Sequence, residues 1–105
     1  MNKIKINNKK IDVKICSTFA SKFTGLMFSR RKNLLFKFNK EKYHPIHMMF
    51  VFYPIKVAWI NKNLKVVDVK LAYPFTPLII PKEKAMYFLE TNPNLDIKIN
   101  DKIEI

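Results

Sequence analysis

Apolar and polar residues alternate over the first fifteen positions of the chain. Isoleucine or valine occupies every second position on either side of a polar run, namely Ile4, Ile6, Ile11, Val13 and Ile15. A period of two places one face of each strand against a core and leaves the other face in water. The pattern predicts a β-hairpin with its turn at Asn7-Asn8-Lys9-Lys10 and with lysines and Asp12 on the outer face.

A helical period replaces this alternation after the hairpin. Four apolar residues share one helical face: Phe19, Phe23, Leu26 and Met27. Ser17 or Thr18 offers an N-cap, and Gly25 suits the left-handed residue that often ends a helix. We expect one short helix near residues 18–25.

The remainder of the chain consists of extended runs separated by polar or proline-bearing turns. Apolar runs typical of strands occupy residues 34–38, 47–52, 55–60, 64–71, 85–90, 97–99 and 103–105. Within 64–71 the alternation predicts one face with Val67, Val69 and Leu71, and a polar, solvated face with Val66, Asp68 and Lys70. Three prolines at positions 74, 77 and 81 favour an extended loop there, because each disfavours helix in its predecessor.

These elements predict a single small domain over residues 1–105 that is mainly β (α+β). The sheet is expected to be antiparallel or to form a partly open barrel with the one helix. Gly25 is the only glycine, so positive backbone φ at turns falls to other residues. Asparagine tolerates that region best after glycine, and it occupies the predicted turns at Asn7, Asn8, Asn61, Asn63, Asn94 and Asn100.

The charge balance points to anionic partners without naming one. Twenty Lys and Arg stand against eight Asp and Glu, for a net charge of +12. Such a field attracts nucleic acid, acidic proteins or anionic membranes. Only Arg30 and Arg31 are arginines, and lysine, asparagine and isoleucine are all frequent, so compositional bias explains part of the charge.

The sequence predicts a cytoplasmic protein that inserts no segment into a membrane. Cys16 is the only cysteine, which excludes an internal disulfide and fits a reducing compartment. The first residues alternate lysine with isoleucine and contain no apolar core of a leader peptide. The most apolar run, residues 48–60, is shorter than the roughly 20 residues that span a bilayer.

Several motifs resemble those of one family, domain of unknown function 192. They are Gly25-Leu26-Met27-Phe28 followed by Arg30, then Ile46-His47-Met48, Pro54-Ile55, Ala85–Glu90 and Asn100-Asp101, in that order. The resemblance covers about residues 15–105 and implies a small, mainly-β domain with a short helix near its start. It implies no established activity. Members often carry an acidic residue where this chain has Lys56.

The candidate catalytic and metal-binding groups have no complete set of partners in the sequence. His44 and His47 are separated by two residues but lack a third ligand, so we expect no metal site. Cys16 with His47 would form a nucleophile and base only if the fold joined them. Asp68 and Glu90 are the central acids, and acid–base catalysis would need them to converge. We therefore expect no enzyme activity and no cofactor.

The first functional hypothesis is a binding domain for a small anionic ligand or a protein partner. The dense apolar stretch 48–59 suits the lining of a pocket, although it also suits a plain core. Polar groups flank this stretch and are mostly cationic. We expect them at the mouth of a cleft: Arg30, His47, Tyr53 and Lys56.

The alternative hypothesis is a nucleic-acid-binding accessory protein. A basic segment interleaved with aromatic residues supplies its candidate contacts, namely Arg30, Arg31, Lys32, Lys37, Lys40 and Lys42. Cations beside stacking rings are typical of single-strand binding grooves. A competing interpretation, which we favour, places Phe36 and Phe38 in the core and leaves the lysines as its solvated edge.

Overall fold

The computed structural model describes residues 2–16, 33–46, 48 and 52–105. The expected helix near residues 18–25 and most of the expected strand at 47–52 lie outside these residues. The described part contains no helix, and therefore none long and apolar enough to cross a membrane. Its strands are β1 (Asn2–Ile6), β2 (Lys9–Cys16), β3 (Leu34–Lys42), β4 (Ile55–Ile60), β5 (Val66–Ala72), β6 (Ala85–Thr91) and β7 (Ile103–Glu104).

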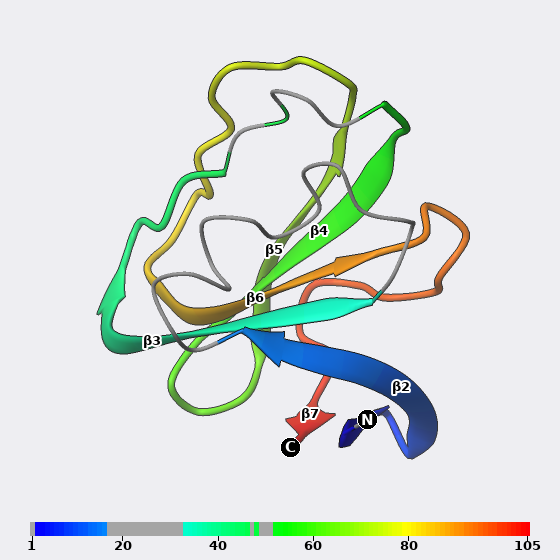
Figure 1. Cartoon of the computed structure of the whole chain (residues 1–105). Helices are drawn as coiled ribbons and strands as arrows, with labels where there is room; N and C mark the ends of the chain where they lie inside the picture. The colour runs from blue at the N-terminus through cyan, green and yellow to red at the C-terminus, as the bar shows by residue number, and fades with distance from the viewer. Residues whose placement is uncertain (1, 17–32, 47, 49–51) are drawn as a thin grey trace.

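The seven strands form one sheet in the order β5-β4-β6-β3-β2-β1-β7. Figure 1 shows that the sheet twists strongly from β4 to β2 and brings the two chain ends together. Every neighbouring pair is antiparallel except β2 and β3, which are parallel. A parallel pair needs a crossover of about a dozen residues or more, and residues 17–33 are long enough to supply it. The mainly-β prediction is confirmed.

Apolar side chains cover both faces of this sheet. The first core lies on one face and contains Leu34, Phe36, Ile46, Met48, Ile55, Val57, Trp59, Ala72, Ala85 and Phe88. The second core lies on the other face and contains Ile4, Ile6, Val13, Leu35, Ala58, Ile60, Val66, Leu89, Ile97 and Ile103. Strand β4 contributes to both, which explains why its sequence is almost continuously apolar rather than alternating.

The predicted hairpin is present, with a tighter turn than its sequence suggested. Strands β1 and β2 pair from Asn2↔Val13 to Ile6↔Lys9, so the turn is Asn7-Asn8 alone. Both asparagines have positive φ, at 50° and 72°. This is the backbone of a two-residue hairpin turn, which asparagine tolerates.

Asparagine replaces glycine at only some of the predicted turns. Asn100 has positive φ, but Asn61, Asn63 and Asn94 do not, and Leu64 and Phe75 take that conformation instead. The Asn61 side chain acts through its oxygen, which accepts the N–H groups of residues 63 and 65 at 3.0 Å. The expectation of positive φ at Asn61, Asn63 and Asn94 was therefore wrong, because asparagine can also stabilise a turn by this side-chain hydrogen bond.

The expected solvation of Asp68 was also wrong. Asp68 pairs with Trp59 across the β4–β5 ladder and is 1% exposed, whereas Leu71 is 49% exposed. The register shifts between Trp59 and Ile60, so Val67 is an extra residue that bends the edge strand. Asp68 and Lys70 of the face expected to be polar therefore lie on the side of the first core, whereas Val66, on the other side of the bulge, belongs to the second core.

Candidate functional site

The two described residues of the predicted ligand cleft lie on opposite faces of the sheet. Tyr53 is half-buried and packs against the first core. Lys56 shares the other face of β4 with Ala58, and its Nζ donates to the backbone oxygen of Leu95 at 2.6 Å. Arg30 and His47 lie outside the described residues. The structure thus describes no cleft that joins Tyr53 to Lys56.

The described half of the predicted nucleic-acid surface lies on β3. Lys40 and Lys42 are exposed and Lys37 is half-buried, while Arg30, Arg31 and Lys32 fall outside the described residues. Two of the aromatic rings nearby are already engaged, while Tyr43 is exposed. Phe36 stacks on Phe88 at 4.5 Å, and Phe38 packs against the first core. Phe36 is thus a core residue, as expected, and Phe38 is half-buried beside the core.

His44 has structural contacts through both its ring and its backbone. The ring stacks on Phe38 with centroids 3.7 Å apart, and its Nε2 lies 2.9 Å from the Lys40 carbonyl oxygen. Its own carbonyl oxygen accepts the Trp59 indole N–H at 2.9 Å. Among the described residues no three metal-ligating side chains gather. His47 and the Cys16 side chain, the other predicted partners, are not described.

Glu90 is a carboxyl group within the first core. It pairs with Leu34 of β3 on one side and Val57 of β4 on the other, and it is 6% exposed. Desolvation by burial raises the pKa of the Glu90 carboxyl from 4.5 to about 8. An apolar environment disfavours the charged form of a carboxyl group, so Glu90 is mostly protonated at neutral pH.

Asp68, the other central acid, anchors a loop to the sheet. One carboxylate oxygen accepts the Val69 N–H and the other accepts the Lys82 N–H, both at 2.9 Å. Lys70 Nζ lies 3.9 Å from Asp68 Oδ2 and donates to the Ile80 carbonyl oxygen at 2.6 Å. These contacts use both carboxylate oxygens, so Asp68 is a structural group.

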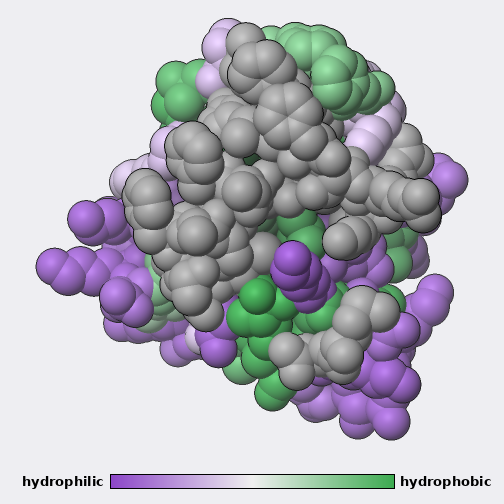
Figure 2. Space-filling view, in the orientation of Figure 1, coloured by the Kyte–Doolittle hydropathy of each residue, from purple (hydrophilic) through white to green (hydrophobic). Residues whose placement is uncertain are grey.

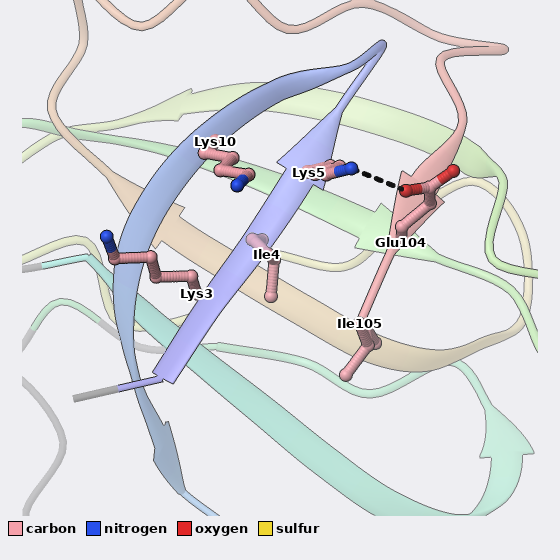
Figure 3. Close-up of a pocket in the computed structure, with 6 residues that line it drawn as sticks. All are labelled: Lys3, Ile4, Lys5, Lys10, Glu104 and Ile105. Atoms are coloured by element: carbon pink, nitrogen blue, oxygen red, sulfur yellow. Dashed lines mark ion pairs between the residues drawn. The ribbon is translucent and has the colours of Figure 1, made fainter.

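A small pocket lies at the β1–β7 edge, with a volume of about 230 Å³. Figure 3 shows its lining: Lys3, Ile4, Lys5, Lys10, Glu104 and Ile105. Three of the six residues are lysines and one is an acid. Lys5 Nζ lies 3.8 Å from Glu104 Oε2, with both side chains substantially exposed, so this ion pair contributes little stability.

Two of these lysines are direct partners across the hairpin. Lys5 pairs with Lys10 in the β1–β2 register, so their side chains project from the same face. Like charges directly opposite on antiparallel strands destabilise the sheet. The neighbouring pair, Lys3 and Asp12, has opposite charges instead. Sequence reasoning missed this pocket, although a turn limited to Asn7-Asn8 would have placed Lys5 opposite Lys10.

Comparison with known proteins identifies the family. The chain matches the family model DUF192, described as uncharacterized ACR, over residues 2–105. It is 35% identical over 100 residues to a UPF0127 protein of Thermococcus sibiricus, and the match covers 88% of this chain but 64% of that relative. The chain therefore spans less than two thirds of that relative's length.

Two solved structures share the fold. One is a protein of unknown function from Novosphingobium aromaticivorans, with a TM-score of 0.88, 19% identity and coverage of 98% of this chain and 84% of that one. The other, a Sinorhizobium meliloti protein described as a candidate transcription regulator, has a TM-score of 0.84, 20% identity and coverage of 97% and 91%. The chain belongs to the domain of unknown function 192 family, as the order of its sequence motifs indicated.

Proposed function

We propose that this protein is a non-enzymatic binding domain for a small anionic ligand, held in the pocket at the β1–β7 edge. The observation that carries the proposal is the pairing of Lys5 with Lys10 across the hairpin, which places two lysines side by side at the pocket, with the Lys5 ammonium group 3.8 Å from Glu104. An anion that binds both lysines replaces their repulsion by two charge-assisted contacts. The ligand therefore supplies stability that the empty hairpin lacks.

The size and lining of the pocket define the class of ligand. Its volume of about 230 Å³ is below the roughly 300–1,000 Å³ of sites for drug-sized molecules. Lys3, Lys5 and Lys10 outnumber Glu104, so the lining carries two net positive charges. Ile105, which is 47% exposed, supplies an apolar border. A compact molecule with two or more carboxylate or phosphate groups fits these features.

The predicted set of Arg30, His47, Tyr53 and Lys56 remains a separate prediction for the same class of ligand. Lys56 supports it least, since its ammonium group is bound to the Leu95 carbonyl oxygen. Lys3, Lys5 and Lys10 belong to neighbouring strands of one hairpin and line a single pocket. The pocket is therefore the better supported location.

Calorimetric titration with citrate and with inorganic pyrophosphate tests the proposal. Lys10→Gln removes one of the two paired lysine charges and should weaken binding by about tenfold, because one charge-assisted contact contributes about 1.5 kcal/mol or more. Lys65→Gln is the matched control, since it removes the same charge from an exposed lysine outside this pocket. It should leave the affinity within about twofold. Equal weakening by both variants, or no heat with either anion, would contradict the proposal.

A further inference from the structure

Five large apolar side chains project into solvent from the loop after β5 and from the residue before Tyr53. They are Phe52, Tyr73, Phe75, Leu78 and Ile80, with exposed fractions between 45% and 66%. We call this set the apolar loop surface. Figure 2 shows hydrophobic side chains at the upper rim of the molecule, where the loop after β5 runs in Figure 1. Phe52 and Phe75 contact one another, and exposed apolar side chains gathered on a small protein mark a surface that binds something.

The backbone of this loop is fixed by hydrogen bonds. Ile46 and Ile79 exchange both backbone hydrogen bonds at 2.9 Å. Met48 donates to the Thr76 carbonyl oxygen and accepts from the Phe75 N–H, both at 2.8 Å. Contacts from Asp68 and Lys70 hold the far end of the loop. The apolar side chains are therefore displayed by an ordered backbone, and binding them requires little further ordering.

Phe75 has a strained backbone within this surface. Its φ is 62°, a conformation that is unfavourable for a bulky residue. The ring makes an edge contact with Phe52 at 5.3 Å, yet it remains 45% exposed and Phe52 remains 66% exposed. Strain of this kind is concentrated at functional sites.

The charge of the protein indicates what this surface meets. Lys70, Lys82 and Lys84 at the end of this loop are accompanied by Asp68, which lies 3.9 Å from Lys70, and by Glu83, and the whole chain carries +12. Exposed Phe, Tyr, Leu and Ile beside lysines are typical of proteins that lie at a lipid interface. Anionic headgroups attract such a charge over about a Debye length, and the apolar side chains then enter the acyl boundary.

We propose that the apolar loop surface docks this protein onto an anionic lipid bilayer. The loop enters only the interface. This inference is independent of the lysine-lined pocket, which lies at the opposite edge of the sheet in strands β1 and β7. Charge supplies long-range attraction, and the loop sets the orientation of the bound protein.

Co-sedimentation with phosphatidylcholine vesicles, with and without phosphatidylglycerol, tests the inference. Wild-type protein should bind the anionic vesicles at least about tenfold more tightly than the zwitterionic ones, and added salt should weaken that binding. Phe52→Ser/Leu78→Ser should lower the partition coefficient by about tenfold or more, because two apolar anchors are lost. Both residues are mostly exposed, so the variant should fold.

The matched control is Tyr43→Ser/Ile99→Ser. It also removes one aromatic and one aliphatic residue, which are 51% and 46% exposed and lie outside the apolar loop surface. This variant should bind anionic vesicles within about twofold of wild type. Equal loss in both double variants, or unchanged binding by Phe52→Ser/Leu78→Ser, would overturn the inference. Wild-type protein that binds neither vesicle would also overturn it and leave a partner protein as the occupant.

Discussion

The buried carboxyl of Glu90 makes a strong prediction about stability and pH. Burial raises the pKa of Glu90 in the folded protein from 4.5 to about 8. Between these values the folded state holds a proton that the unfolded state has released, so stability falls as pH rises. The slope of the free energy of unfolding reaches about 1.4 kcal/mol per pH unit, and the total loss from well below pH 4.5 to well above about 8 is about 5 kcal/mol.

Glu90→Gln removes this titration while keeping the shape of the side chain. In urea unfolding, the free energy of unfolding of wild type should fall by about 4 kcal/mol between about pH 5 and pH 8. That of Glu90→Gln should change much less over the same range. Glu83→Gln, which removes an exposed carboxyl, should keep the wild-type slope. Parallel profiles for wild type and Glu90→Gln would refute the account of Glu90 as a desolvated, protonated acid.

Two further substitutions test the loop anchor and the hairpin turn. Asp68→Asn should lower the free energy of unfolding by about 2 kcal/mol, because the buried carboxylate accepts the Val69 and Lys82 N–H groups and lies near Lys70. A decrease below about 0.5 kcal/mol in urea unfolding would contradict the role of Asp68 as an anchor of the loop. Asn8 has a φ of 72°, so Asn8→Ala should lower the free energy of unfolding by about 1 kcal/mol and Asn8→Gly by much less. Equal decreases for the two variants would contradict a turn that requires positive φ at this position.

Hydrophobic periodicity predicted most strands of this fold because they bury at least one face, but the apolar run at 97–99, expected as a strand, forms none. Apolar and polar residues alternate in the hairpin because its outer face is exposed to water. The sequence of β4 is almost continuously apolar because both its faces are covered. Strand β5 was assigned correctly as a strand, but its inward face was not. A bulge at Val67 and three contacts to the Asp68 carboxylate bury a residue that the pattern placed in solvent.

The candidate site was harder to predict than the strands because it depends on register. Lysines at alternate positions indicate a solvent-exposed face of a strand, but they do not show which lysines are neighbours. Only a two-residue turn places Lys5 opposite Lys10. The raised pKa of Glu90 likewise requires knowledge of its neighbours on β3 and β4. Exposure of Phe52 and Phe75 runs against their hydropathy, so composition alone could not have indicated the apolar loop surface.

The measurement that tests the proposed anion site most directly is a map of amide chemical shifts during titration with inorganic pyrophosphate. The account predicts that the largest changes cluster at residues 3–5, 10 and 104–105, which line the pocket at the β1–β7 edge. Lys10→Gln should shift the titration of this cluster to about tenfold higher pyrophosphate concentration. Small changes spread evenly over lysines elsewhere, such as Lys62, Lys65 and Lys98, would contradict a built site and show that the anion responds only to net charge.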